Sequence, residues 1–489
     1  MSNKQVIVIG AGFSGLSAAS FLAKEGYKVT LLEKHDVPGG RARLFKADGF
    51  TFDMGPSWYW MPDVFERYFA AFGKELANYY DLIRLDPSYR VFFEDEHVDM
   101  PASIEELREL FEHYEPGSGP KLDRFLKDAA YKYKVGIQDL VFKPSKSVME
   151  FADRRVLGGL FKMHLFKSFS SYVRKYFTNP KLIELLEFPV LFLGAKPQNI
   201  PALYSLMNHA DLALGTWYPM GGMHKIVEAM VKVAEDLGVD IRLGQNVNKI
   251  TVVNGVAKEV VTDSEVFSAD VVVGGADYAF IDQQLLEEPF RNYTPSYWDK
   301  RVMAPSSLLY YMGIDKKVPG LLHHNLFFDR SFGDHAIEIY DDPKWPTDPL
   351  FYVSAPSKTD ASVAPEGKEN LFLLIPIAPG LKEDEVAHER LFNQVMDRLE
   401  ARTGMVVRES IIYKRKYSVS NFTEDYNAFR GNAYGLANTL RQTAILKPSL
   451  RNKKVKNLFY TGQLTVPGPG VPPSLISGEV VAREVKKSF

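Results

Sequence analysis

The stretch VIVIGAGFSGLSAASFLAKEGYKVTLLEK, residues 6–34, decides the fold of the N-terminal part of the chain. An apolar run leads into GAGFSG at residues 10–15, a helix of small residues follows, and a second apolar run ends at Glu33. Strand, glycines, helix, strand and acid in this order are typical of a dinucleotide-binding βαβ unit. The sequence therefore predicts a bound adenine dinucleotide.

Each part of this unit has its own physical role. Gly10 permits the tight turn from strand to helix, Gly12 lets the backbone approach a pyrophosphate, and Gly15 lets the helix pack close to the strand. The helix N-terminus offers free N–H groups and a partial positive charge to phosphates. The carboxylate of Glu33 can accept hydrogen bonds from ribose hydroxyls. The cofactor contacts expected from this unit are Gly10, Gly12, Phe13, Ser14, Gly15, Glu33 and Lys34.

The composition excludes several classes of site. The chain has 489 residues, of which 46% are hydrophobic and 25% charged, and its net charge is −2. These values are ordinary for a globular protein of two or three folding units, and nothing in them points to nucleic acid. The absence of cysteine excludes disulfides, thiolate metal sites and a covalent cysteinyl flavin. No metal-ligand spacing and no Ser-His-Asp arrangement stands out, so we expect no metal site.

The ends and apolar runs of the chain bear on its location. The N-terminus enters the first strand directly, without the basic segment and apolar core of a secretory signal. No apolar run approaches the roughly 20 residues that span a bilayer. We therefore expect a cytoplasmic protein that is soluble or peripherally attached to a membrane.

A second glycine-rich segment follows the βαβ unit. The loop PGGRAR, residues 38–43, combines glycines whose amides can come near a ligand with two arginines that can bind phosphate or pair with carboxylates. A Gly-Pro turn at residues 55–57 can place main-chain groups beside a ring system. Taken alone, the arginine loop also fits a solvated surface loop. The expected contacts are Gly39, Gly40, Arg41, Arg43, Gly55, Pro56 and Ser57.

Residues 154–183 form a basic stretch with an apolar stripe. They contain seven Lys or Arg residues and no acidic residue. If the substrate is a lipid, a helix of this kind fits a membrane interface, where lysines meet anionic headgroups. The pattern equally fits a core-facing stripe with a solvated charged face. The stripe repeats every four residues, at Leu157, Phe161, Leu165, Phe169, Val173 and Phe177.

The C-terminal part shows the strand–glycine–helix pattern again. An apolar run closes on glycine at residues 456–463, a Gly/Pro loop follows at 467–473, and a helix of small residues ends the chain. Two phosphate-type turns predict one α/β, Rossmann-like cofactor domain built from both termini, with α+β insertions. The expected ranges are 1–75, 218–290 and 440–489 for the cofactor domain, 76–110 and 291–439 for the substrate domain, and 111–217 for a helical, membrane-associating region.

Together these segments resemble the FAD-dependent amine oxidase and phytoene desaturase superfamily. The resemblance is carried by residues 10–15, 38–43, 51–57, 218–223 and 461–472. The segments APSKTDASVAPEG (355–367) and DYNAFRGNAYG (425–435) resemble bacterial and fungal carotenoid desaturases in particular. The resemblance covers nearly the whole chain. It implies FAD, a hydrophobic channel for an apolar carotenoid, and peripheral attachment to the membrane that stores this substrate.

Carried over by position, the resemblance also implies roles for single residues. The glycines of 10–15 would meet the FAD pyrophosphate, and Glu33 the adenosine ribose. Arg41 and Arg43 would lie along the cofactor, and residues 55–57 near the isoalloxazine. Val247 would approach the adenine through its backbone, and the pyrophosphate–flavin end would be lined by Gly462, Gly470, Val471 and Pro472. The segment WYWMP (58–62) is bulkier and more aromatic than in many relatives, which concerns the substrate and not the flavin.

Desaturation would remove two hydrogens from adjacent carbons of the substrate. A flavin accepts one as hydride, and the other leaves as a proton. Candidate proton acceptors are Glu150 and Asp153, although isolated acids at a helix start usually serve as caps. No second GxGxxG is present for a nicotinamide, so we expect a quinone or oxygen to reoxidise the flavin.

The leading interpretation is an FAD-dependent desaturase that converts phytoene to carotenes of the lycopene or neurosporene type. Within the same fold, the alternatives are a desaturase of a hydroxylated or partly desaturated carotenoid (3,4-desaturase type) and a carotene isomerase. A soluble FAD amine oxidase is an alternative with a different chemistry. Its substrate would be polar, so the basic and apolar stretch at residues 154–183 would have no membrane to bind. A non-catalytic flavoprotein would leave the cofactor elements at both termini without a reaction.

Overall fold

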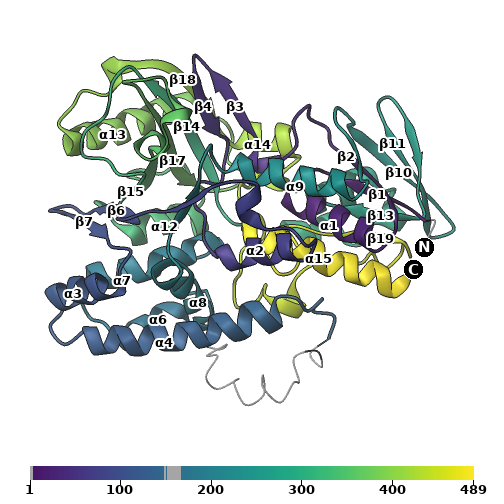
Figure 1. Ribbon diagram of the computed structural model, residues 1–489, viewed down its shortest axis with the longest axis horizontal. Coiled ribbons are helices and arrows are strands. Elements are labelled where there is room, and N and C mark those ends of the chain that lie inside the picture. Colours follow the sequence, from purple (N-terminus) through teal and green to yellow (C-terminus); the bar gives the residue numbers. More distant parts are fainter. Residues whose placement is uncertain (1–3, 148–149, 151–166) are drawn as a thin grey trace.

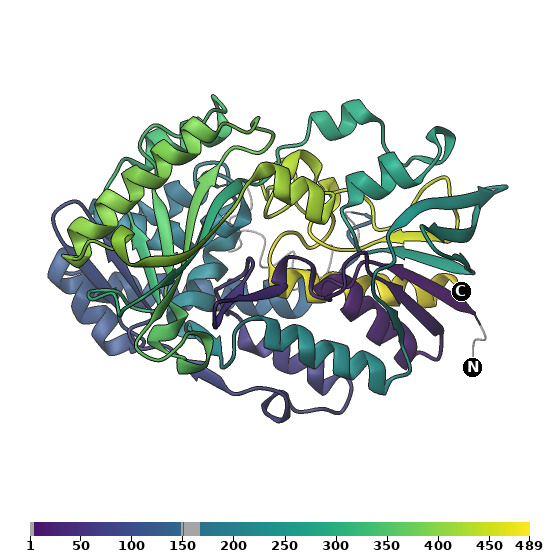
Figure 2. The same cartoon turned by 90° about the horizontal axis from the view of Figure 1, so that it is seen from above.

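The structure is a computed structural model that describes residues 4–147, 150 and 167–489. A parallel sheet and the helices around it occupy one end of the molecule, and a larger mixed sheet occupies the other (Figures 1 and 2). The N- and C-terminal ends of the chain lie close together at the first end (Figure 1).

The parallel sheet has five strands in the order β19-β13-β1-β2-β9, with every neighbouring pair parallel. The central strands β1 and β13 are nearly continuous Val and Ile runs, because both faces of such a sheet are covered. As predicted, strands from the two ends of the chain share this sheet. The strands are β1 (Gln5–Ile9), β2 (Lys28–Leu32), β9 (Asp240–Arg242), β13 (Val271–Gly274) and β19 (Leu458–Tyr460).

Helix α1 (Phe13–Lys24) packs against both α9 (His224–Asp236) and α15 (Val471–Ser488). Small residues allow the α1–α15 contact, since a Cβ on Gly478 would lie 2.5 Å from the carbonyl oxygen of Ser14. The Ser17 hydroxyl donates to the carbonyl oxygen of Leu475 at 2.7 Å. The last helix of the chain is thus fixed to the first.

The mixed sheet has seven strands in the order β18-β14-β17-β16-β15-β6-β7, antiparallel except for the β15–β6 pair. Side chains alternate along β14: Leu308 and Tyr310 join the cluster under α13 (Glu385–Thr403), while Leu309 and Tyr311 join the larger core on the opposite face. The strands are β6 (Tyr89–Phe92), β7 (His97–Met100), β14 (Ser306–Ile314), β15 (His324–Phe327), β16 (Phe351–Ser354), β17 (Glu369–Ile377) and β18 (Ile411–Tyr417).

A third sheet and several shorter elements connect these layers. The sheet is antiparallel, in the order β10-β11-β12. Its strands are β10 (Val247–Val253), β11 (Val256–Thr262) and β12 (Val266–Ser268). Two ribbons pair β3 (Leu44–Ala47) with β4 (Phe50–Asp53) and β5 (Leu82–Arg84) with β8 (Trp217–Pro219). Further helices are α2 (Pro62–Ala70), α10 (Tyr278–Phe280), α11 (Pro295–Asp299), α12 (Phe332–Tyr340) and α14 (Val419–Tyr426).

The helical region contains α3 (Ile104–Tyr114), α4 (Gly119–Val135), α6 (Phe169–Val173), α7 (Pro180–Glu187) and α8 (Leu206–Asn208). Here the prediction of a membrane helix over 154–183 is wrong for residues 167–183. Phe169, Val173 and Phe177 are fully buried in the core, and the chain leaves helix after α6. The first half of the stripe, with Leu157, Phe161 and Leu165, lies outside the described residues.

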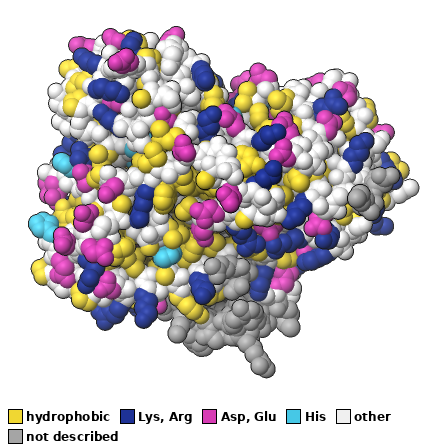
Figure 3. Space-filling model, in the orientation of Figure 1, with side chains coloured by type: hydrophobic (Ala, Val, Ile, Leu, Met, Phe, Trp, Pro, Cys, Tyr) yellow, Lys and Arg dark blue, Asp and Glu magenta, His cyan; other side chains and the backbone are white. Residues whose placement is uncertain are grey.

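Two further features concern the surface and the helices. Positive and negative side chains are interspersed over the face shown in Figure 3. Among the helices of the described ranges, none has the length and apolar character needed to cross a bilayer.

Candidate cofactor and substrate site

A cavity of about 460 Å³ lies between the parallel and the mixed sheet. Its wall combines the carboxyl ends of β1, β2, β13 and β19 with side chains from β14, β15, β16 and β17. In open α/β sheets, ligands bind outside the carboxyl ends of the strands. The cavity is therefore placed for a nucleotide at one end and for an apolar molecule at the other.

The glycine turn after β1 has the expected geometry. Gly10 has φ of +98°, which other residues rarely adopt, and a Cβ on Gly15 would lie 1.9 Å from the Gly10 carbonyl oxygen. A Cβ on Gly12 would meet no atom of a neighbouring segment within 4 Å among the residues that the structure describes. Gly10 thus makes the turn, Gly15 makes the close helix contact, and Gly12 leaves space in front of the turn.

The second glycine segment lies on the first. The N–H of Gly39 donates to the carbonyl oxygen of Ala11 at 2.8 Å, and a Cβ on Gly40 would lie 3.3 Å from the Gly12 Cα. Gly55 in turn packs on the Arg41 backbone, because its Cβ would lie 2.7 Å from the Arg41 carbonyl oxygen. Two loops that are separate in the sequence therefore form one wall.

Two helix N-termini face this wall. Helix α1 begins after Gly12, which supplies no side-chain cap, so its first-turn N–H groups stay free for a ligand. Helix α15 begins after Gly470, and because Pro472 and Pro473 have no N–H and the Ser474 N–H donates to the Gly470 carbonyl oxygen, its first turn offers the N–H of Val471. The strand–glycine turn at Gly462 meets α1, since a Cβ there would lie 3.1 Å from the Ser14 hydroxyl oxygen. Two positive dipole ends at one cavity favour a doubly anionic group such as a pyrophosphate.

The acid that ends β2 is buried beside the same turn. Oε2 of Glu33 accepts from the Ala11 N–H at 2.8 Å, and Oε1 accepts from the His35 N–H at 3.1 Å. Lys34 donates to the carbonyl oxygen of Glu424 at 2.6 Å, and burial lowers its pKa. The Glu33 carboxylate is thus fixed by two backbone N–H donors, and its oxygens can still accept hydrogen bonds from hydroxyl groups.

Arg41 is a partly buried cation with spare hydrogen-bonding capacity. One guanidinium nitrogen donates to the carbonyl oxygen of Asn432 at 3.1 Å, but Nε has no hydrogen-bond partner among the described residues. Burial lowers the pKa of this guanidinium, while the carboxylate of Asp277 opposes the shift. A buried donor without a partner costs free energy unless a ligand supplies the acceptor.

Most of the predicted contacts line the cavity. They are Gly10, Gly12, Phe13, Ser14, Glu33, Lys34, Gly39, Gly40, Arg41, Gly55, Pro56, Ser57, Val247, Gly462, Gly470, Val471 and Pro472.

Three predicted site residues lie elsewhere. Gly15 is behind the turn, and Arg43 pairs with Asp425 at 2.7 Å rather than facing the cavity. Glu150 accepts from the Lys146 N–H at 3.0 Å and is not part of the cavity wall. Asp153 lies outside the described residues.

The far part of the cavity is apolar and aromatic. Trp58 stacks on His324 with the ring centroids 4.1 Å apart, and its ring also contacts Phe188 and Phe192 at 5.3 and 5.9 Å. Strands β14–β17 and helix α12 complete this wall with Leu309, Leu326, Ile339, Tyr352, Phe372 and Leu374. A long apolar molecule would be shielded from water here.

Sequence reasoning missed several residues of this wall. Asp277 follows β13 at the same carboxyl edge as Glu33, so the rule that identified Glu33 applies to it as well. Tyr352 and His335 carry no local signal, because only the pairing of β16 and the packing of α12 bring them to the cavity.

The residues present fit FAD. An anionic group that accepts hydrogen bonds would fit three features of the site. These are the Nε of Arg41, which has no partner among the described residues, the open space in front of Gly12, and the two helix N-termini without a side-chain cap. Glu33 is available to ribose hydroxyls. No group of three or more His, Asp or Glu side chains in the described ranges is arranged to hold a metal ion.

Known proteins match this chain over nearly its full length. The family model for flavin-containing amine oxidoreductase matches residues 13–486. A carotenoid 3,4-desaturase from Haloarcula japonica is 43% identical over 485 residues, covering 99% of this chain and 98% of the relative. A zeta-carotene-forming phytoene desaturase from Myxococcus xanthus is 33% identical and covers 99% and 94%. The crystal structure of a CLA-producing fatty acid isomerase from P. acnes has a TM-score of 0.62 at 16% identity, covers 100% of this chain and 99% of that one, and shows the fold alone.

Proposed function

The chain belongs to the flavin-containing amine oxidoreductase family and is an FAD-dependent oxidoreductase, and from this premise we propose that it is a carotenoid desaturase of the 3,4-desaturase type. Its substrate would be an acyclic carotenoid that is already hydroxylated or partly desaturated. The observation that carries the proposal is the 43% identity to the Haloarcula japonica enzyme over 99% of the chain, joined to an aromatic cavity next to the nucleotide turn.

Bound FAD would supply the hydride acceptor for the reaction. The chain's own residues would hold and orient it: the two helix N-termini and Arg41 would bind the pyrophosphate, and Glu33 would bind the ribose. Trp58, Phe188 and Tyr352 would surround the reacting carbons of the substrate with an apolar wall that excludes water. A cationic centre that forms on the substrate would then not react with water.

Phytoene is the second candidate substrate. The Myxococcus xanthus enzyme, a phytoene desaturase, is 33% identical over 99% of the chain, and the cavity wall is apolar enough for a fully hydrocarbon substrate.

Purified protein with FAD in liposomes separates the two substrates. We expect a hydroxylated or partly desaturated acyclic carotenoid to gain one double bond, seen as a red-shifted spectrum and a new chromatographic peak, while phytoene stays colourless. Coloured products from phytoene would overturn the substrate choice. Flavin reduction by an amine and by no carotenoid would overturn the reaction class.

Two further proposals have separate tests. We infer that a quinone or oxygen reoxidises the flavin, and adding each alone to the reduced protein gives the two rates to compare. We also infer peripheral attachment to a membrane, which co-sedimentation with anionic and neutral vesicles would test.

A further inference from the structure

A second, small cavity lies behind Ser57. Its volume of about 30 Å³ has room for about one to two water molecules. Gly55, Ser57 and Phe372 line both this cavity and the large one, so they form the partition between them. The wall of the small cavity mixes apolar side chains such as Phe52 and Val363 with several polar ones. The polar side chains in its wall are Thr51, Asp53, Ser57, Tyr218, His323, Ser354 and Asn370.

Ser57 is held in place from the substrate side of this partition. The Tyr352 hydroxyl donates to the Ser57 oxygen at 3.0 Å, and Nδ1 of His324 lies 2.6 Å from the Tyr352 oxygen. Because the single hydroxyl hydrogen of Tyr352 goes to Ser57, Nδ1 carries the hydrogen that Tyr352 accepts. Burial lowers the pKa of His324 well below its ordinary range, so the imidazole is neutral. The Ser57 hydroxyl hydrogen itself is therefore free to donate.

Asp53 is the acid of the small cavity. It ends β4, and its two oxygens accept from the N–H groups of Met223 and His224 at 2.8 and 3.0 Å, which also caps helix α9. Burial raises the pKa of Asp53 to about 6. This carboxyl can therefore take up a proton near neutral pH.

The groups around Asp53 do not compete for that proton. Burial raises the pKa of Tyr218 of β8 and lowers that of His224 on α9. Burial also lowers the pKa of His323, to about 3. All three stay neutral at pH 7. Asp360 beyond Tyr218 has a lowered pKa, because the hydroxyls of Ser362 and Tyr218 and the N–H groups of Gly221 and Ser362 stabilise its charged form.

We propose that Ser57 passes the proton released by desaturation through the partition into the small cavity, where water and Asp53 receive it. The proposal rests on the proposed desaturation. One C–H bond breaks, and its hydrogen leaves with the bonding electron pair as a hydride, which oxidised flavin accepts. The adjacent C–H bond breaks, its electron pair forms the new C=C bond, and its proton moves to the Ser57 oxygen. The original Ser57 hydroxyl hydrogen then moves through water to the Asp53 carboxylate.

The test compares three variants. Ser57→Ala removes the hydroxyl from the partition, and Asp53→Asn removes the proton acceptor while its amide oxygen still accepts a backbone N–H. Ser307→Ala is the matched control, because Ser307 lines the large cavity but not the small one. Flavin reduction by the carotenoid is followed anaerobically by rapid mixing, between pH 5 and 9 and in H₂O and D₂O.

We expect wild-type flavin reduction to slow below about pH 6 and to be slower in D₂O. Ser57→Ala should be about 100-fold slower and lose the D₂O effect, since a positioned proton carrier contributes at least that much. In Asp53→Asn, flavin reduction should be slow at every pH, and its rate should no longer decline below pH 6. Ser307→Ala should keep both the pH profile and the D₂O effect.

An infrared titration supplies a readout without turnover. In the FAD-bound protein without carotenoid, a protonated-carboxyl band should titrate near pH 6 and be missing in Asp53→Asn. A Ser57→Ala protein that keeps the D₂O effect, or a band that does not titrate, overturns the proton route. No flavin reduction by any carotenoid in the wild type overturns the proposed function instead, whatever the band does, and the proton route falls with it.

Discussion

At Gly15 a Cβ would collide with the Gly10 carbonyl oxygen at 1.9 Å, while at Gly12 it would meet no atom within 4 Å. Gly15→Ala should therefore destabilise the apoprotein by more than about 3 kcal/mol, because a backbone atom must move. Gly12→Ala should change the apoprotein's stability by less than about 1 kcal/mol but weaken FAD binding, because the added methyl group occupies the space in front of the turn.

Thermal unfolding of the apoprotein and flavin titration by absorbance measure the two effects separately. Equal destabilisation by both substitutions would contradict the division of roles within the turn.

Asp211 provides a pH-dependent test of a buried acid. Its Oδ2 accepts from the Tyr89 hydroxyl at 2.9 Å, and burial raises its pKa from 3.8 to about 7. The folded state therefore binds more protons than the unfolded state between these values, and the free energy of unfolding falls as the pH rises through this window. Asp211→Asn should be more stable than wild type at pH 8 by up to about 4 kcal/mol, and nearly equal to it near pH 4.

Urea unfolding of the apoprotein at pH 4 to 8 measures this difference. Asp36→Asn, at an exposed position, is the control and should show no such pH dependence. A wild type whose stability matches that of Asp211→Asn at pH 8 would refute the assignment.

Residues of the βαβ unit could be predicted from the sequence because their roles are local. Gly10, Gly12 and Glu33 depend only on one strand, one turn and the next strand. Asp53 and Tyr352 could not be predicted, because their environment arises where β4, α9 and the mixed sheet meet.

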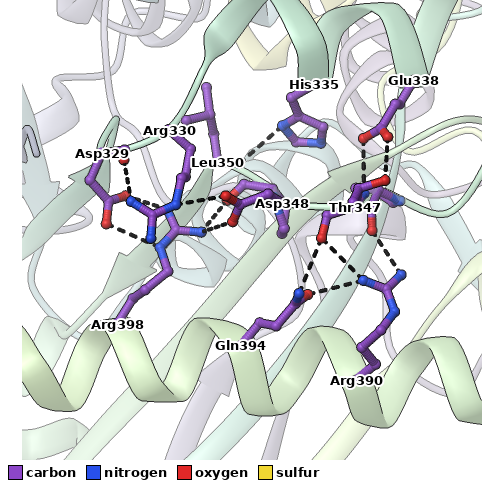
Figure 4. A network of polar contacts seen from close by, with 12 residues as sticks. Asp329, Arg330, His335, Glu338, Thr347, Asp348, Leu350, Arg390, Gln394 and Arg398 are labelled. Atoms are coloured by element: carbon purple, nitrogen blue, oxygen red, sulfur yellow. Dashed lines mark hydrogen bonds and ion pairs between the residues drawn. The ribbon is translucent and has the colours of Figure 1, made fainter.

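At the scale of elements, α12 and the chain after it are held to α13 by a polar network (Figure 4). Arg398 forms an ion pair with Asp329, to which its Nε donates at 3.1 Å, and its Nη1 donates to the carbonyl oxygen of Pro349 at 2.6 Å. Both charged side chains are at least nine-tenths buried. The segment they hold carries His335, whose Nδ1 accepts from the Leu350 N–H at 3.1 Å and which lines the cavity.

Arg398→Met should lower the free energy of unfolding by about 3–5 kcal/mol, because Asp329 is left buried without its partner. It should also weaken carotenoid binding, since the cavity wall loses its support. Arg390→Met, on an exposed part of the same helix, should cost less than about 1 kcal/mol. Chemical unfolding and the quenching of Trp fluorescence by bound carotenoid measure the two properties. A similar loss in both variants would contradict the argument.

The basic stretch shows where the sequence of one element could not decide between a membrane-facing and a core-facing stripe. A Leu/Phe stripe with a charged face has the same period whether it contacts lipid or a protein core. Phe169, Val173 and Phe177 are buried in the same cluster as side chains of α4, for example Phe125, whose ring centroid lies 6.1 Å from that of Phe177. The sequence of one helix contains no information about such a neighbour.

For the whole molecule, the joining of both chain ends in one sheet is the feature that the sequence predicted well, because each end has its own glycine turn. Lys4 Nζ donates to the Phe489 carbonyl oxygen at 2.9 Å, so the ends can be linked. A circular permutant with a short flexible linker and new ends at the exposed Asn254 turn should bind FAD like the wild type. Deletion of residues 456–489 removes β19 and α15 and should abolish FAD binding. Flavin absorbance after purification measures both, and a deletion variant that retains FAD would contradict this view.

The position of β19 at the edge of the parallel sheet also affects synthesis on the ribosome. The edge of β13 that pairs with β19 stays open until residues 458–460 have been made. At about 5–20 residues per second, the nascent chain spends roughly ten to forty seconds between translating β13 and translating β19. During that time an apolar strand edge is exposed to other chains. The yield of soluble protein should therefore depend on chaperones that shield nascent chains and on a lower growth temperature.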